Sequence, residues 1–281
     1  MNINIKILGL ILITVYIFTN TVAEAQVTPL SIQDYSILDS AGMEISYRVE
    51  TMNDSRKPDK KTPDIQKLLI GRKISKIYSC TLFYYDSLAT VLIAKGAQNY
   101  PICQSPVMPV EVIKDFSKKT LSVIYRTLTE DLFLYEEQLP EFNWIIQPEK
   151  KTILTHMCQK ALTSFRGRNY EAWFAPDLPF PDGPFKFSGL PGLILEIRDT
   201  QGHYSFQCIG IKKLKPAKPI ALYDWPYNRT TREELNAFLI KMHNDPFGYF
   251  KSKGQTLQMI ENGKEINKPK DYWPYNPVET E

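Results

Sequence analysis

The sequence predicts an α+β fold in which one or two helices pack against a curved antiparallel β-sheet, with a half-barrel as one form of that curvature. Three observations lead to this class. Short apolar segments separated by charged turns recur over residues 121–147, and two strand pairs with tight turns follow over residues 155–208. One stretch near the end, residues 231–244, has the apolar spacing of a helix. Many strands followed by a helix are typical of α+β domains.

The N-terminal part of the sheet is predicted from residues 32–95. Strand-favouring side chains over residues 32–49 are interrupted by Gly42, which predicts an opening hairpin that turns there. Residues 51–63 are polar and contain two prolines, so we expect an exposed loop. Another strand is expected over residues 68–85, and the composition of residues 86–95 favours a helix.

The apolar segments between residues 121 and 147 indicate an antiparallel meander of three strands, the last of them over residues 142–146. After it, residues 155–165 and 170–175 are expected to pair as a hairpin, because Gly167 can adopt a positive φ at the turn. That register places Lys160 next to Trp173 on the facing strand, within reach of a cation–π contact.

Residues 175–184 contain too many prolines for a ladder strand, so they are expected to form a defined extended loop. Leu190-Pro191-Gly192-Leu193 fits a type II turn, with proline at the first central position and glycine at the second. The turn leads into a second hairpin, whose strands are expected over residues 193–199 and 204–208.

The best helix of the sequence covers residues 231–244. Thr231 and Glu234 have the spacing of a capping box, and Pro246 is expected to end the helix. A short phrase occurs on both sides of it, as Trp225-Pro226-Tyr227-Asn228 and Trp273-Pro274-Tyr275-Asn276. Two copies are either a coincidence or two similar aromatic anchors, and do not indicate a structural repeat.

The N-terminus has the features of a secretory signal peptide. Lys6 precedes an apolar run over residues 7–18, and the small residue Ala25 ends the segment, so we expect cleavage after Ala25. The apolar run is shorter than a transmembrane helix needs, and no later segment in the sequence has that length. We therefore expect a periplasmic or secreted protein, with one domain over residues 26–262 and a tail over residues 263–281.

The formal net charge of +3 is small, so the composition gives no reason to expect a nucleic-acid partner. Four cysteines in an oxidising compartment allow disulfides. Pairing Cys80 with Cys103 and Cys158 with Cys208 is preferred over the other two connectivities, and the alternative is four small buried thiols without a disulfide.

Signatures of catalysis and cofactor binding are weak in this sequence. No HExxH, GxSxG or phosphate-binding glycine loop is present, and the three histidines lack metal-ligand spacing. No cofactor and no metal site are expected. Asp177 and Asp182 lie in the proline-rich loop and Glu171 lies on the strand before it. A glycosidase would need two such carboxylates about 5–10 Å apart. The alternative is that the aspartates cap turns.

Aromatic side chains are concentrated around the same loop, interleaved with prolines. Core packing explains most of them, and the alternative is a rigid binding face for a peptide, a glycan or a protein. The residues assigned to this face are Trp173, Phe174, Phe180, Phe185, Phe187 and Lys160.

Residues 183–194, with the sequence GPFKFSGLPGLI, resemble the GLPGLI family of envelope proteins from Bacteroidetes, together with Phe165-Arg166-Gly167-Arg168 and Ala172-Trp173. That family is uncharacterised and is similar to the bowl-like N-terminal domain of a bacterial peptide-N-glycosidase. The resemblance therefore implies a module that accompanies enzymes without containing their active site, and it transfers no catalytic residue.

The sequence leads to a non-enzymatic exported binding or accessory module that uses the aromatic, proline-rich loop. Its expected partner is an envelope protein, a peptide or a glycan. The alternative is an envelope hydrolase that acts on glycan or glycopeptide through the loop carboxylates.

Overall fold

The computed structural model describes residues 27–103, 105, 107–127, 131–254 and 275–281, and the backbone of residues 18–19, 260–261 and 264–265. Among them, twelve strands form one open sheet that is antiparallel except at β13, which runs parallel to β7. In spatial order these strands are β13 (Asn228–Arg229), β7 (Leu132–Gln138), β6 (Thr120–Arg126), β5 (Val110–Asp115), β4 (Ile74–Ser79), β3 (Thr62–Ile70), β2 (Tyr35–Thr51), β12 (Tyr204–Tyr223), β11 (Leu193–Asp199), β10 (Arg168–Ala175), β9 (His156–Phe165) and β8 (Ile145–Ile153).

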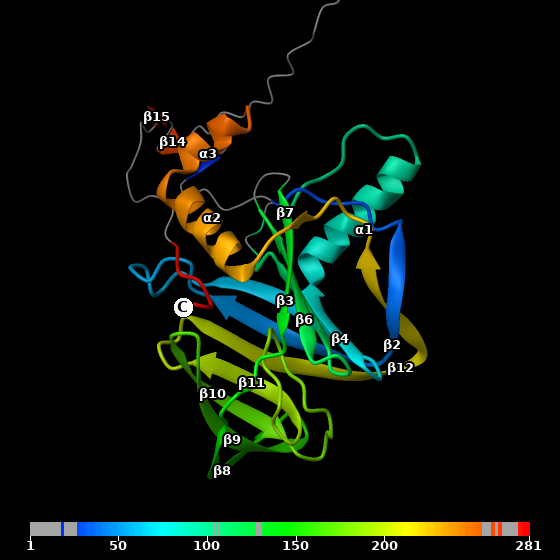
Figure 1. The fold of residues 1–281 in the computed structure, drawn as a ribbon, viewed down its shortest axis with the longest axis vertical. Helices are drawn as coiled ribbons and strands as arrows, with labels where there is room; N and C mark the ends of the chain where they lie inside the picture. Colours follow the sequence, from blue (N-terminus) through cyan, green and yellow to red (C-terminus); the bar gives the residue numbers. More distant parts are fainter. Residues whose placement is uncertain are drawn as a thin grey trace, which may run out of the picture.

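Figure 1 shows the sheet as a strongly curved surface with helices at its upper end. The helices are α1 (Cys80–Ala94), α2 (Arg232–Asn244) and α3 (Pro246–Ser252). A small second sheet contains β1 (Phe18–Thr19), β14 (Ile260–Glu261) and β15 (Lys264–Glu265). The curved α+β fold that the sequence predicts is therefore confirmed.

The opening hairpin predicted at Gly42 is wrong, because β2 continues through this residue as one strand of 17 residues. The irregularity lies in the partner strand β12, where residues 214–217 have no partner between the pairs Met43–Lys213 and Ala41–Lys218. This bulge bends the sheet opposite Gly42 and leaves the backbone of β2 extended. Alternate side chains of β2, including Ile45, are fully buried in the core.

The strand predicted over residues 68–85 is in fact two strands and the start of a helix. Ser79 caps α1 by accepting a hydrogen bond from the Leu82 backbone amide (3.3 Å). Tertiary contacts favour a helix over a strand here, because Asp86 is buried and forms an ion pair with Arg126 (2.7 Å). The aromatic side chains of this helix favour strands locally, which explains the error.

The meander is confirmed for β6 and β7, which pair directly, and wrong for its third segment. Residues 145 and 146 belong to β8, which pairs with β9 at the other edge of the sheet. Both later hairpins are confirmed: β9 pairs with β10, with Lys160 directly opposite Trp173, and β11 pairs with β12.

The C-terminal helix is confirmed with its capping box between Thr231 and Glu234. It ends at Asn244, and Pro246 starts α3. The predicted signal peptide falls outside the described residues except at Phe18–Thr19. Of the predicted tail, residues 275–281 pack against the turn between β9 and β10, where the Thr280 amide donates to the Arg166 carbonyl (3.0 Å). No helix in the described part of the chain is long and apolar enough to cross a membrane.

Candidate functional site

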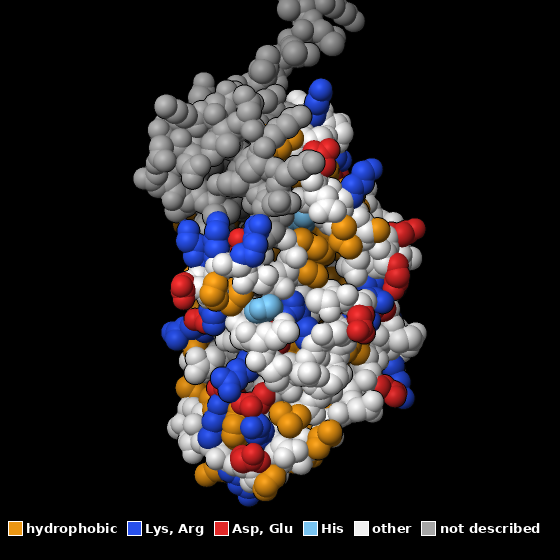
Figure 2. Space-filling view, turned by 90° about the vertical axis from the view of Figure 1, so that its left-hand side faces the viewer, with side chains coloured by type: hydrophobic (Ala, Val, Ile, Leu, Met, Phe, Trp, Pro, Cys, Tyr) orange, Lys and Arg blue, Asp and Glu red, His pale blue; other side chains and the backbone are white. Residues whose placement is uncertain are grey.

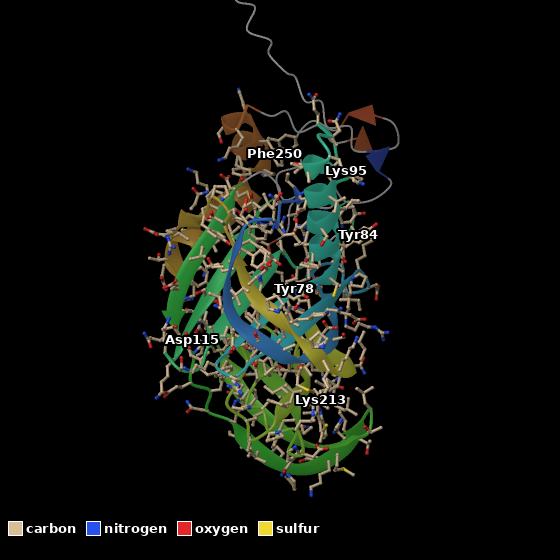
Figure 3. The ribbon with its side chains drawn as sticks, turned by 90° about the vertical axis from the view of Figure 1, so that its right-hand side faces the viewer. Tyr78, Tyr84, Lys95, Asp115, Lys213 and Phe250 are labelled. Carbon is tan, nitrogen blue, oxygen red and sulfur yellow. The ribbon has the colours of Figure 1, made fainter. Side chains whose placement is uncertain are left out.

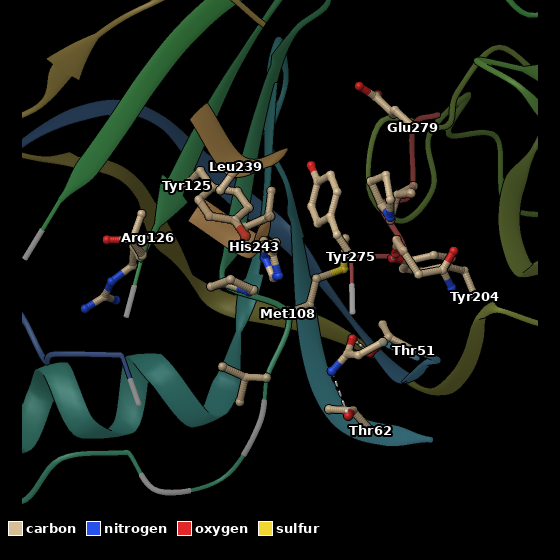
Figure 4. Close-up of a pocket in the computed structure, with 18 of the residues that line it drawn as sticks. Thr51, Thr62, Met108, Tyr125, Arg126, Tyr204, Leu239, His243, Tyr275 and Glu279 are labelled. Atoms are coloured by element: carbon tan, nitrogen blue, oxygen red, sulfur yellow. Dashed lines mark hydrogen bonds between the residues drawn. The ribbon is translucent and has the colours of Figure 1, made fainter. Parts of the chain in front are cut away.

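A cavity of about 300 Å³ lies between the inner face of the sheet and α2, and Figure 4 shows side chains from several elements around it. Most of its walls are apolar or aromatic. The side chains that make up these walls are Val27, Val107, Met108, Val110, Val123, Tyr125, Tyr135, Phe185, Tyr204, Leu235, Leu239, Met242, Tyr275 and Val278. Concave, mainly apolar sites with a few polar groups are the usual form of small-molecule binding sites.

The sheet wall comes from neighbouring strands in direct register. Val110 of β5 pairs with Tyr125 of β6, and Val123 of β6 pairs with Tyr135 of β7. Because side chains alternate between the two faces of a strand, positions 123 and 125 share one face, and their partners share it too. This placement explains why the two tyrosine rings line the same cavity.

The opposite wall is the buried stripe of α2. Leu235, Leu239 and Met242 recur at helical spacing and are 3–4% exposed. His243 follows Met242 directly, and its ring lies 4.7 Å from the Tyr275 ring, centroid to centroid, at an angle of 31°. The helix therefore connects the sheet wall to the C-terminal segment.

The C-terminal segment, residues 275–281, contributes a third wall. Arg168 donates to the Pro277 carbonyl (2.6 Å) and to the Asn276 side chain (2.7 Å), and it forms an ion pair with Asp199 (3.0 Å). The Tyr204 hydroxyl also donates to the Asn276 carbonyl. These bonds fix the segment against β10 and β12.

A buried network of charged side chains binds the same segment through Glu279. Lys186 is fully buried and reaches Glu137 (2.7 Å), Glu279 (2.7 Å) and the Tyr135 hydroxyl (2.8 Å), while Arg166 pairs with Glu137 (2.6 Å) and Glu279 (2.7 Å). Burial raises the pKa of Glu137, but hydrogen bonds and charges from Arg166 and Lys186 outweigh it, so the pKa lies below its ordinary value. Glu137 therefore stays charged between its two cationic partners.

The tyrosines of the cavity remain neutral hydroxyls at physiological pH. Burial, followed by the charge of Glu279, raises the pKa of Tyr275 to about 12, and burial also raises the pKa values of Tyr125 and Tyr204. The cavity thus offers aromatic rings and a few neutral polar groups to a ligand.

The loop between β2 and β3 supplies the polar border of the cavity, with Asn53, Asp54, Lys57 and Lys60 among the lining residues. Asp54 accepts a hydrogen bond from the Arg56 guanidinium (2.8 Å). This bond, together with the Arg56 backbone amide and the nearby positive charges, lowers the pKa of Asp54 although burial raises it. Figure 2 shows the left-hand side of the molecule as drawn in Figure 1, where lysine and arginine side chains lie close to exposed hydrophobic ones.

The aromatic segment predicted as a binding face is largely core. Trp173, Phe174, Phe185 and Phe187 are 9%, 1%, 6% and 0% exposed, and Phe180 is partly buried against the same core cluster. These rings therefore offer little surface to a partner, and a binding role through them stays a prediction. Of the assigned residues, Phe185 is the one that lines the cavity.

Lys160 lies on β9, where its ammonium is 5.9 Å from the Trp173 ring centroid and 3.0 Å from Glu171. The cation–π contact that the sequence predicts is present, and Lys151 lies closer to the same ring, at 4.4 Å. Both lysines belong to the outer strands β8 and β9, away from the cavity lining.

The three carboxylates of the hydrolase alternative have separate partners. Glu171 binds Lys160 and Arg198 (3.1 Å), and Asp177 is 2.6 Å from His156. Asp182 is buried and forms an ion pair with Lys114 (2.5 Å). None of the three lines the cavity.

All four cysteines are free thiols in the structure, so the predicted disulfides between Cys80 and Cys103 and between Cys158 and Cys208 are absent. Three of the four are buried, as expected for small apolar residues. Burial raises the pKa of Cys80, Cys158 and Cys208 to about 11, which disfavours their thiolate forms. The described residues contain no cluster of His, Cys, Asp and Glu side chains suited to a metal ion.

The turn that the sequence predicts at Leu190–Leu193 differs in its hydrogen bonds. The Leu193 amide donates to Leu178 (2.9 Å) rather than across the turn, and the Gly192 amide donates to Leu190 (2.8 Å). The Ile194 amide donates to Asp182 (2.9 Å). The motif therefore binds the proline-rich loop through its backbone.

Sequence reasoning missed most of the cavity, because its walls come from strands, a helix and a C-terminal segment that are distant in the chain. One signal was available in the repeated Trp-Pro-Tyr-Asn phrase. Trp225 is buried and donates to Ser31 (2.6 Å), and in the second copy Tyr275 and Asn276 form part of the cavity wall. The described parts of both copies are thus aromatic anchors, which agrees with the second of the two interpretations given for this phrase.

Comparison with known proteins gives one family match. Residues 166–196 match Porph_ging, described as a protein of unknown function. This match covers the turn between β9 and β10, the proline-rich loop and most of β11. The GLPGLI likeness stays a resemblance, resting on the residues that carry it.

Two crystal structures of PNGF-II, in the P21 and C2 space groups, are similar in fold. The first has a TM-score of 0.47 at 15% identity over 73% of this chain, and the second a TM-score of 0.46 at 16% identity over 72%. The chain spans about a third of the length of these structures, 34% and 33%. A search of curated proteins gave no match.

Proposed function

We propose that this protein is an exported, non-enzymatic binding module that takes an apolar ligand, or the apolar end of a larger partner, into the cavity beneath α2. The proposal rests on the contrast between the apolar walls of the cavity and the paired charged side chains beside them. The walls are tyrosine, methionine and aliphatic side chains, while the buried charges next to them, such as Glu279 and Arg126, have partners of opposite sign. Such a site favours burial of apolar surface over chemistry on a polar bond.

If the partner is the envelope protein, peptide or glycan that the sequence leads us to expect, its apolar part would bind in this cavity. A hydrolase acting on glycan or glycopeptide ranks second, because it needs two convergent carboxylates. Glu171, Asp177 and Asp182 are bound to different cations and rings instead. Export rests on the signal-like N-terminus, and N-terminal sequencing of the mature protein, expected to begin at Gln26, tests it.

The binding site is tested by filling the cavity. N-phenyl-1-naphthylamine is neutral and fluoresces when it enters an apolar site, so its titration reports binding directly. We expect saturable binding to the wild-type protein and a loss of at least about tenfold in affinity for Met242→Trp, because the larger ring occupies the space of the probe.

Ile240→Trp is the matched control, because Ile240 is on the same helix and 48% exposed. It should bind the probe like the wild type. Circular dichroism and thermal unfolding of both variants show whether they are folded. Equal binding by wild type and a folded Met242→Trp variant would contradict the proposal.

A further inference from the structure

Two lysines border the cavity without strong partners of their own. The Lys57 ammonium is 3.9 Å from Asp54, at the limit of an ion pair, and its side chain is 50% exposed. Lys60 is exposed and has no ion-pair partner among the residues that the structure describes. The backbone joins the two, because the Lys60 amide donates to the Lys57 carbonyl (2.9 Å) in one turn of the loop.

The other charged residues of the cavity lining are already neutralised. Arg126 is bound bidentately by Asp86, at 2.7 and 2.8 Å. Asp54 is bound by Arg56 and Glu279 by Lys186, at 2.8 and 2.7 Å. The charge that remains for a ligand is therefore positive and is confined to one side of the opening.

We propose that the ligand is a single-chain amphiphile with an anionic head, whose apolar chain lies in the cavity and whose carboxylate or phosphate lies at Lys57 and Lys60. The inference rests on the proposed function and specifies the ligand class of that same site. An apolar chain matches walls of tyrosine, methionine and leucine, and an anionic head matches two ammonium groups that stay in contact with water. A neutral or cationic head would leave these lysines without a partner.

Competition against N-phenyl-1-naphthylamine tests the head group separately from the chain. Dodecanoate and dodecyl phosphate are expected to displace the probe at about tenfold lower concentration than dodecanol or dodecyltrimethylammonium, since two half-exposed ion pairs each contribute modestly. The advantage should largely vanish at about 1 M salt, where the Debye length is about 3 Å. Comparing dodecanoate with dodecyl phosphate shows which of the two anionic heads the site prefers.

The double variant Lys57→Gln/Lys60→Gln should lose this advantage, so that the four amphiphiles displace the probe bound to this variant at similar concentrations. Lys61→Gln is the matched control, because Lys61 lies in the same loop, pairs with Glu50 (3.5 Å) and is not part of the lining. It should behave like the wild type.

The outcomes separate the two proposals. Failure of the neutral probe to bind contradicts the proposed function itself. Binding of the probe with equal displacement by all four amphiphiles, or an unchanged preference in the double variant, overturns the anionic head alone. Sedimentation with phosphatidylglycerol vesicles covers the remaining source of anionic groups. Co-sedimentation that a saturating amount of dodecanoate leaves unchanged indicates adsorption to a membrane surface and overturns binding of a single amphiphile.

Discussion

Lys114 is a fully buried lysine whose ammonium group donates to three oxygens of one loop. Its partners are the Asp182 carboxylate (2.5 Å) and the carbonyls of Gly183 (2.7 Å) and Phe187 (3.1 Å). Burial lowers the pKa of Lys114 and the charge of Asp182 raises it, so the lysine depends on its partner to remain charged. One side chain of β5 thereby fixes both ends of the segment that contains Phe185.

Removing one member of this pair should destabilise the protein strongly. We expect Asp182→Ala to lower the free energy of unfolding by about 3–5 kcal/mol, because it leaves a buried ammonium without its counter-charge. Urea unfolding measures the change. Lys118→Ala is the control, since Lys118 is 78% exposed and pairs with Asp115 at 3.5 Å, and it should cost less than about 1 kcal/mol. Equal costs for the two variants would show that the buried pair has no special role.

Asp64 should make stability depend on pH in the mildly acidic range. Burial raises the pKa of its carboxyl to about 6, although hydrogen bonds from Ser79 and from the Ile65 amide act in the opposite direction. Because the folded protein holds this proton more tightly than the unfolded chain, the contribution to stability is complete below about pH 4. It is lost as the pH rises through about 6.

Asp64→Asn should remove this dependence. The difference in unfolding free energy between about pH 4 and about pH 7 is expected to change by up to about 3 kcal/mol relative to the wild type, in favour of the variant at the higher pH. Chemical denaturation at both pH values measures it. The exposed Asp59→Asn serves as the control, and an identical pH profile for Asp64→Asn and wild type would refute the assignment.

Some residue contacts could be derived from the sequence and others could not. Lys160 opposite Trp173 followed from a local turn at Gly167, where counting residues fixes the register. Lys114 and Asp182 are 68 residues apart, and no local pattern connects them. Their pairing depends on how the sheet curves, so it became visible only in the folded structure.

At the scale of elements, the glycine–proline motif before β11 acts through its backbone. Gly192 has a φ of +156°, and a Cβ atom built there would lie 2.3 Å from the Ala175 carbonyl oxygen. A Cβ atom at Gly183 would lie 2.8 Å from the Ile194 side chain. Close approach of β10, the proline-rich loop and β11 therefore requires glycine at both positions, which gives the motif an architectural role.

Gly192→Ala should disrupt this approach. We expect it to lower the free energy of unfolding by about 2–4 kcal/mol, since either the backbone contact or the turn must shift. Gly42→Ala is the matched control, because a Cβ atom at Gly42 meets nothing within 4 Å in the extended strand β2. Its effect should stay within about 1 kcal/mol. Thermal unfolding of the two variants gives the comparison, and a neutral Gly192→Ala would contradict the close packing.

The elements with a local signal were predicted well, and those set by distant contacts were not. The capping box of α2 and the turn of the hairpin β9–β10 are written in a few adjacent residues. The bulge of β12 opposite Gly42 and the helix α1, whose Asp86 is bound by Arg126, depend on partners elsewhere in the chain. Figure 3 shows α1 at the side of the molecule, with Tyr84 and Lys95 along it and Tyr78 on the sheet below.

At the scale of the whole molecule, curvature of the sheet creates the cavity and the C-terminal segment completes it. The two arginines of the β9–β10 turn bind this segment, Arg166 through Glu279 and Arg168 through Asn276 and Pro277. Gly167 makes the approach possible, because a Cβ atom there would lie 1.9 Å from the Thr280 hydroxyl oxygen. The family match over residues 166–196 thus covers both the turn that binds the segment and the loop that contributes Phe185.

The most direct measurement of a ligand site beneath α2 is methyl NMR of the methionine-labelled protein titrated with N-phenyl-1-naphthylamine. Met108 and Met242 line the cavity, whereas Met157 is 57% exposed on β9. We expect the methyl signals of Met108 and Met242 to shift together, saturably and at the affinity given by fluorescence, while the Met157 signal stays in place. Saturable fluorescence with unchanged Met108 and Met242 signals would place the ligand elsewhere and contradict the site.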